Sequence, residues 1–153
     1  RECAEKANSH DRALGFSTFP ALHFLLMTEI CLDSHDWENA LRYAEEGLKT
    51  AKSHGARTGG MLDILLGKAL AKAQPSQRVS AEELILQGIS ILEELRMKPS
   101  QAQGYLYLGE LYTDTGQKER ALQTIKKAES AFRKMGMDYW LRRTQEELAR
   151  LQG

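Results

Sequence analysis

Residues 105–128 read YLYLGELYTDTGQKERALQTIKKA, and this stretch decides the fold. Tyr105, Leu108 and Tyr112 recur at the spacing of one helix face, and a second stripe of the same period follows them. Gly116 stands between the two stripes, at a position where glycine often ends a helix. The stretch therefore predicts two helices joined by a short turn.

The same pattern recurs at a nearly constant interval along the chain. Ala40, Ala81 and Ala121 are 41 and 40 residues apart, and a Gly or Ala stands seven residues after each of them. Such self-similarity is typical of helical repeats that stack on one another and bury a continuous core. We therefore expect one domain, an α-solenoid over residues 1–153, with repeats at about 18–55, 57–97 and 99–135 and a capping helix at 137–151.

Several local signals predict where the helices end. Pro20 and Pro99 suit the first turn of a helix. Ser80 is followed by Glu83 at the spacing of a capping box, which predicts that Ser80 caps the second helix of the second repeat. Residues 1–10 are interpreted as the end of a preceding helix, residues 11–17 have no assignable pattern, and the missing initial Met indicates a piece of a longer chain.

The composition agrees with an all-α fold. The 153 residues include twenty-two Leu and seventeen Ala but one Val, so helix formers far outnumber the β-branched residues that favour strands. Two cysteines are too few for a disulfide scaffold, which favours free thiols in a reducing, cytoplasmic compartment. No apolar stretch is long enough to span a membrane, and the charged first residues lack the apolar segment of a signal peptide.

The charges argue against a nucleic-acid-binding module. The chain has 21 basic and 21 acidic residues, and the two signs are balanced in both halves. A protein that contacts a phosphate backbone normally has a basic excess. The basic residues near the C-terminus are interleaved with glutamates, so we interpret them as a solvated outer surface. The predicted capping helix has the same kind of outer face, formed by Arg142, Arg143, Glu146, Glu147 and Arg150.

The third repeat resembles the tetratricopeptide repeat family in the Leu108-Gly109 pair, Tyr112, and the small residues Ala121 and Ala128. The period of about 40 exceeds the 34 of the family and indicates helices of roughly 17 residues, about 25 Å long. Long-helix variants of this kind are similar to the repeat regions of bacterial multidomain signalling regulators, which also carry a cyclase or kinase domain and an AAA-type ATPase.

The resemblance implies a non-catalytic, regulatory protein-binding module. Members of the family usually bind partners on a concave face formed by the first helix of each repeat. The expected partner is a protein or peptide, which includes another domain of the same chain, and an uncapped end favours weak homodimerisation. The register of the third repeat, carried to the other two, predicts the following groove residues: Glu29, Asp33, Lys68, Lys72, Gln103, Glu110 and Asp114.

The same residues have a purely structural interpretation, which can hold together with the functional one. Lys68 and Lys72 alternate with acidic neighbours, so ion pairs between repeats would align them at ~0.2–1 kcal/mol per pair. Glu29 and Glu110 stand where relatives that clamp a C-terminal carboxylate have Asn, so we expect no chaperone-tail function.

An alternative function is a small-molecule sensor. Apolar side chains that the register places between the first helices predict a pocket formed by Leu22, Leu25, Met61, Ile64 and Leu106.

No catalytic or cofactor site is expected. Gly60 and the run Gly67-Lys68-Ala69 imitate a phosphate-binding loop, but the spacing is too long and Ala69 replaces the hydroxyl residue that magnesium needs. Cys31 and His35 are four residues apart, yet no second pair completes a metal site. We therefore predict that the protein is not an enzyme and holds neither a metal nor a cofactor.

Overall fold

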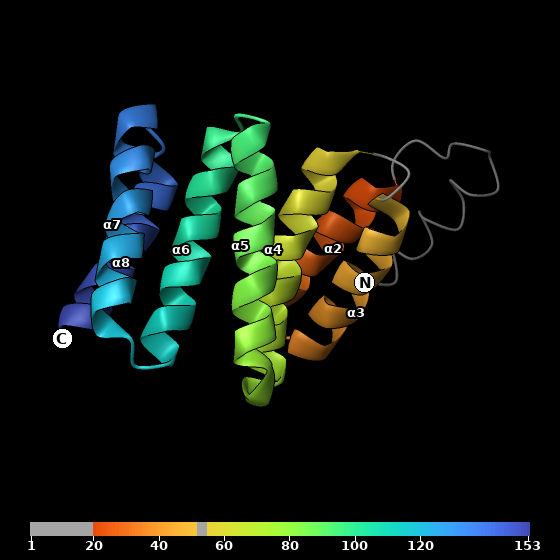
Figure 1. Ribbon diagram of the computed structural model, residues 1–153, viewed down its shortest axis with the longest axis horizontal. Coiled ribbons are helices and arrows are strands. Elements are labelled where there is room, and N and C mark those ends of the chain that lie inside the picture. Colours follow the sequence, from red (N-terminus) through yellow and green to blue (C-terminus); the bar gives the residue numbers. More distant parts are fainter. Residues whose placement is uncertain (1–19, 52–54) are drawn as a thin grey trace.

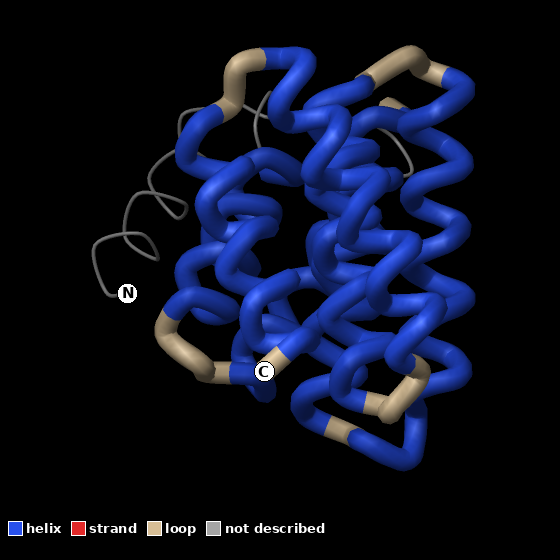
Figure 2. The backbone as a smooth tube through the Cα atoms, turned by 90° about the vertical axis from the view of Figure 1, so that its left-hand side faces the viewer, coloured by secondary structure: helices blue, strands red, loops and turns tan. Residues whose placement is uncertain are grey.

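The computed structural model describes residues 20–51 and 55–153, and within these ranges the regular structure is entirely helical (Figures 1 and 2). The all-α expectation is confirmed. The expected helix end at residues 1–10 and the unassigned residues 11–17 lie outside the described residues. The described elements are α2 (Pro20–Asp33), α3 (Trp37–Ala51), α4 (Ala56–Ala73), the short 3₁₀ helix η1 (Pro75–Gln77), α5 (Arg78–Glu94), α6 (Lys98–Asp114), α7 (Lys118–Met135) and α8 (Asp138–Gln152).

The helices pack in sequence order as pairs, α2 with α3, α4 with α5, and α6 with α7. Contacts also join α2 to α4, α4 to α6, and α6 to α8, so these four helices form an inner layer. The helices α3, α5 and α7 form the outer layer, and Figure 1 shows the pairs following one another along the long axis. This arrangement confirms the predicted α-solenoid.

Small residues allow the two layers to approach closely. Ala40, Ala81 and Ala121 are fully buried. A Cβ atom added at Gly67 would lie 2.6 Å from Cγ1 of Ile85 and 2.7 Å from the Ala81 carbonyl oxygen, both on α5. The alternation of small residues in the sequence therefore reflects the contact between the paired helices.

Four helices end in the same way. Residues in the left-handed region follow α2, α5, α6 and α7; they are His35, Arg96, Gly116 and Gly136. After α6, the N–H of Gln117 donates to the Tyr112 carbonyl and that of Gly116 donates to the Thr113 carbonyl. This is the Schellman pattern, and the role predicted for Gly116 is confirmed.

The predicted capping role of Ser80 is wrong. Helix α5 begins at Arg78, and its N-cap is Gln77, whose side chain makes no capping hydrogen bond. The chain already turns helically in η1, where Pro75 fixes the backbone angle of the first residue. Ser80 therefore lies inside the first turn of α5, and its hydroxyl contacts the Gln77 side chain at 3.4 Å.

Candidate functional site

Two ion pairs connect the predicted groove residues of α4 to those of α6. Lys68 Nζ lies 3.5 Å from Glu110 Oε2, and Lys72 Nζ lies 2.7 Å from Asp114 Oδ2. Each pair joins neighbouring helices of the inner layer at the same level. The structural interpretation therefore holds for these four side chains, because their charges align the second repeat with the third.

Helix α8 extends this network. A guanidinium nitrogen of Arg150 lies 3.6 Å from Asp114 Oδ1 and 2.9 Å from Glu147 Oε2. Asp114 thus receives a cation from the helix on each side of α6. The placement of Glu147 and Arg150 on the outer face is wrong, because α8 continues the inner layer and turns these residues toward Asp114, although 52% of the Arg150 side chain is exposed to solvent.

Lys68 is the most enclosed of the groove cations. Only 14% of its side chain is exposed, and its Nζ lies 3.9 Å from the centre of the Tyr107 ring. Burial lowers the pKa of Lys68 and raises the pKa of Glu110, and in each case the charge of the other partner opposes the shift. Lys68 is therefore held by an anion and a ring within the protein.

The acidic pair on α2 is different. Among the described residues, no ion pair joins Glu29 or Asp33 to a lysine or arginine. Burial raises the pKa of Glu29, and the neighbouring Asp33 charge raises it further. In the described part of the chain, the predicted ion pairs from Lys68 and Lys72 to these two acids do not form, so the two carboxylates line this end of the groove without a salt bridge.

The four inner helices enclose one cleft of about 140 Å³. Its lining extends from α2 to α8, so the inner layer is curved enough for its first and last helices to share a cleft. The lining residues are Glu29, Leu32, Asp33, Leu65, Lys68, Tyr107, Tyr139, Trp140 and Arg143.

The cleft has cationic and aromatic groups that sequence reasoning missed. The Arg143 guanidinium lies 4.9 Å from the centre of the Trp140 ring, and Tyr139 lines the cleft with them. Arg143 was placed on the outer surface because α8 was treated only as a cap. The signal that could have found it is Thr144, a buried small residue that corresponds to Gly109 of α6 and Thr28 of α2.

Gln103 lies near Glu29 but does not line the cleft. It lines a space of about 10 Å³ together with Met61 and Ile64, which is too small for more than a water molecule. Leu25 and Leu106 are buried in the core. The described side chains therefore leave no room for a metabolite in the predicted apolar pocket.

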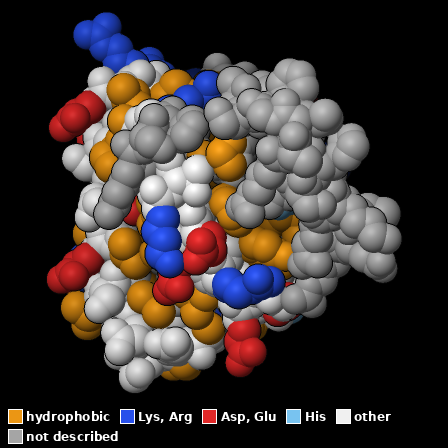
Figure 3. Space-filling model, turned by 90° about the vertical axis from the view of Figure 1, so that its right-hand side faces the viewer, with side chains coloured by type: hydrophobic (Ala, Val, Ile, Leu, Met, Phe, Trp, Pro, Cys, Tyr) orange, Lys and Arg blue, Asp and Glu red, His pale blue; other side chains and the backbone are white. Residues whose placement is uncertain are grey.

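One face of α2 is apolar and exposed. Leu22, Leu26 and Ile30 follow one another at four-residue spacing, and each is about half exposed. Figure 3 views this end of the molecule and shows apolar surface interspersed with acidic and basic side chains. Such a surface is consistent with self-association, and the homodimer stays a prediction.

The residues that imitate other sites have structural roles. Gly60 and Gly67 both lie within α4, where they face α5 closely. Cys31 is buried, and the His35 ring lies against Trp37. Across residues 20–51 and 55–153, no group of three or more metal-ligating side chains comes together. None of the helices in the described part of the chain has the length and apolarity needed to cross a membrane.

Comparisons with known proteins give the fold. No family model matches the sequence, and no curated protein matches it. Among solved structures, the chain is similar to the apo form of RapI, a helical-repeat solenoid, with a TM-score of 0.77 and 18% sequence identity. The match covers 98% of this chain and 54% of RapI, so the chain spans about half the length of that protein. The likeness supports the helical-repeat architecture.

Proposed function

We propose that this chain is a non-catalytic tetratricopeptide-like interaction module that binds a peptide or a partner domain in the inner-layer groove. The parent would be a cytoplasmic bacterial signalling regulator in which repeats 18–55, 57–97 and 99–135 belong to a longer chain. Partner binding would then be transmitted to an attached effector domain.

The distribution of charge in the cleft carries the proposal. Glu29 and Asp33 form its acidic wall, whereas Arg143 lies on the α8 side with the Trp140 and Tyr139 rings beside it. Lys68 is already paired with Glu110, whereas Glu29 and Asp33 form no salt bridge within the described residues. The acidic wall is therefore available to bind a positive charge of a ligand. A peptide would place a basic side chain or its amino terminus there, and its carbonyl groups or an acidic side chain beside Arg143.

The aromatic side chains add apolar area to this recognition. Tyr107 forms the floor of the cleft beneath Lys68, and Trp140 stacks on Phe132 with ring centres 5.8 Å apart. Rings whose positions are fixed by packing lose little freedom when a ligand binds them. The proposed groove thus combines a charged wall with a rigid aromatic surface.

A displayed library of random peptides tests this proposal. Peptides selected on the wild-type chain should be rich in Lys or Arg, and their Kd should rise at least about tenfold with the double variant Glu29→Gln, Asp33→Asn, because each lost charge contact contributes on the order of 1 kcal/mol. Glutamine and asparagine keep the shape of the wall and remove its charge.

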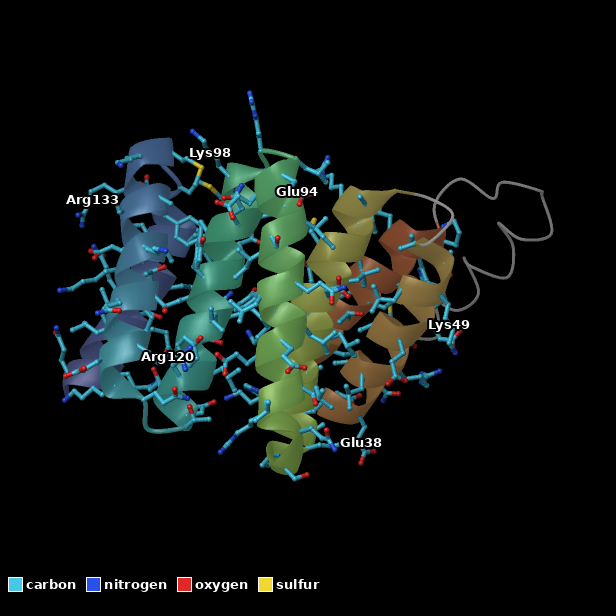
Figure 4. The ribbon with its side chains drawn as sticks, in the orientation of Figure 1. Glu38, Lys49, Glu94, Lys98, Arg120 and Arg133 are labelled. Carbon is cyan, nitrogen blue, oxygen red and sulfur yellow. The ribbon has the colours of Figure 1, made fainter. Side chains whose placement is uncertain are left out.

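The matched control is the double variant Glu38→Gln, Glu45→Gln on α3. Both carboxylates are exposed on the outer layer, and Figure 4 labels Glu38 at the lower end of that helix. The control removes the same net charge and should leave the Kd unchanged. Equal loss of affinity in both double variants would show a generic attraction between charges and count against the groove.

A further inference from the structure

A second hollow lies on the outer side of the molecule, between α3 and α5. Its volume is about 550 Å³, within the range of small-molecule sites, and α4 forms its floor. Figure 1 shows α4 between α3 and α5. We call this hollow the α3–α5 groove; its main lining residues are Leu48, Ala51, Gly59, Asp63, Gln87 and Ile91.

Asp63 is the notable group in the α3–α5 groove. Its side chain lines the groove although the residue is only 6% exposed. Its side chain accepts a hydrogen bond from Gln87, whose amide Nε2 donates to Oδ2 at a distance of 3.4 Å. A carboxylate buried with one long hydrogen bond has much unused capacity to accept hydrogen bonds.

Comparison of the inner helices explains why this groove is open. Asp63 stands four residues before the buried Gly67, and an aromatic residue stands four residues before the corresponding small residue in each other inner helix. These aromatic residues are Phe24, Tyr105 and Trp140. In the third repeat, Tyr105 corresponds to Asp63 and Lys127 corresponds to Gln87. There Lys127 Nζ lies 5.1 Å from the centre of the Tyr105 ring.

Two differences thus distinguish the second repeat from its neighbours. First, the Asp63 carboxylate replaces the aromatic ring of the other inner helices, which leaves space above α4. Second, Gly59 adds to that space, because a Cβ there would have no neighbour within 4 Å. The packing of the repeat does not require the acid, since the other three inner helices pack with an aromatic residue at this position.

The other charges around Asp63 do not neutralise it. Lys49 from α3 lines the same groove, but its ammonium lies 2.9 Å from Glu46, and 71% of its side chain is exposed (Figure 4). Helix α5 contributes the uncharged Gln87, and α4 contributes no second charged lining residue. Burial raises the pKa of Asp63 to about 6, so at pH 7.5 the side chain is ionised at an energetic cost.

We propose that the α3–α5 groove binds a small organic cation, a primary amine or guanidine on a short apolar body. Its cationic group would donate to Asp63 and to the side-chain oxygen of Gln87, while the apolar body would lie against Leu48, Ala51 and Ile91. This site is separate from the inner-layer groove and does not rest on the function proposed for it. The ligand would compensate the buried Asp63 charge, which has a single long hydrogen bond from Gln87 among the described residues.

Titrations of the complete chain with three amines, each paired with its neutral alcohol, test this site. The probes are phenethylamine, hexylamine and 4-phenylbutylamine, against 2-phenylethanol, hexan-1-ol and 4-phenylbutan-1-ol, followed by backbone amide chemical shifts at pH 7.5. At least one amine should saturate with shifts that cluster on Gly59, Asp63 and Ile91, and should bind at least tenfold more tightly than its alcohol.

Two variants separate charge from space. Asp63→Asn retains an acceptor for Gln87 and should weaken the amine at least tenfold while leaving the alcohol unchanged. Asp63→Phe introduces the aromatic residue of the other repeats and should remove binding of both. If Asp63→Phe fails to fold, Asp63→Asn together with pH still decides the matter, because wild-type affinity for the amine should fall about tenfold between pH 7.5 and pH 5.

Three results would overturn the proposal. The first is that no amine produces saturating shifts in the groove at concentrations up to about 10 mM, roughly tenfold above a weak, millimolar Kd. The second is equal affinity for an amine and its alcohol. The third is an amine affinity that Asp63→Asn leaves unchanged.

Discussion

The ammonium group of Lys72 lies 2.7 Å from a carboxylate oxygen of Asp114, and the two residues belong to different repeats. One helical turn away, Lys68 meets Glu110 in the same manner. These pairs fix the level at which α4 and α6 lie side by side. The groove and its charge pattern therefore depend on contacts that also hold the repeats together.

Charge reversal at Lys68 is expected to destabilise the fold. Lys68→Glu would place a second carboxylate against Glu110 in a site where both side chains are 14% exposed, and breaking a buried pair costs about 3 kcal/mol or more. Denaturation by urea should show this loss in the free energy of unfolding. An apolar double replacement, Lys68→Met with Glu110→Leu, should instead remain within about 1.5 kcal/mol of the wild type.

The sequence alone favours reversal of Lys68 and Lys72 as a test of partner binding with the fold intact. The ion pairs make that experiment ambiguous, because a loss of binding could follow from a loss of stability. A reversed Lys68 that unfolds with wild-type stability would show that the pair with Glu110 does not hold the repeats in register.

Asp63 should make stability depend on pH in a direction opposite to an ordinary salt-bridged carboxylate. Its pKa in the folded state is about 6, against 3.8 for the unperturbed group, so its favourable contribution is complete below pH 3.8 and is lost as the pH rises through 6. The free energy of unfolding of the wild type, minus that of Asp63→Asn, should fall by about 2–3 kcal/mol between pH 4 and pH 7.5.

The subtraction cancels the pH-dependent contributions of Glu29 and Glu110, whose pKa values are also raised, because both residues are present in both proteins. Urea titrations at several pH values measure the difference. A difference that stays constant across this range would mean that the Asp63 carboxylate is as well solvated in the folded chain as in the unfolded one.

Overpacking between paired helices tests the repeat register. Ala81 and Ala121 have no exposed surface, so Ala81→Leu and Ala121→Leu should each cost about 1–3 kcal/mol. Ala149→Leu on the exposed face of α8 is the matched control and should change stability by less than about 0.5 kcal/mol. Thermal unfolding compares the three, and equal melting temperatures would show that these alanines do not lie where the helices approach most closely.

Substitutions at the ends of α5 and α7 are expected to change stability in opposite directions. Gly136 has φ 66° and Arg96 has φ 56° at equivalent positions after α7 and α5. Gly136→Ala should lower stability by about 1 kcal/mol, because a side chain is strained in the left-handed region, whereas Arg96→Gly should raise it by up to about 1 kcal/mol. Denaturation curves that move the same way for both variants would contradict this interpretation.

Sequence periodicity predicted the all-α solenoid because small residues recur wherever the paired helices meet. It also placed Lys68, Lys72, Glu110 and Asp114 on one surface. The sequence could not show which acid each lysine contacts, since that depends on how far neighbouring inner helices are displaced along their axes. The lysines pair toward α6, which leaves Glu29 without a described ion pair.

Two further features could not be predicted for a related reason. The role of α8 depends on the curvature of the inner layer, which brings Arg143 into the same cleft as Asp33. The groove beside Asp63 exists because this position has no aromatic ring. Hydrophobic periodicity does not identify such a position, since it is based on apolar residues and Asp63 is acidic. Comparison of corresponding positions between the repeats would have identified Asp63.

The central claim is that a peptide binds the inner layer against the acidic wall of α2. The most direct measurement is the map of backbone amide chemical shifts when a peptide from the selected library is added to the chain. The shifts should cluster on α2, α4, α6 and the first two turns of α8, around Glu29, Asp33 and Arg143, and the same titration should need at least about tenfold more peptide with Glu29→Gln, Asp33→Asn. Shifts that cluster instead on α3, α5 and α7, and persist in that double variant, would contradict the account.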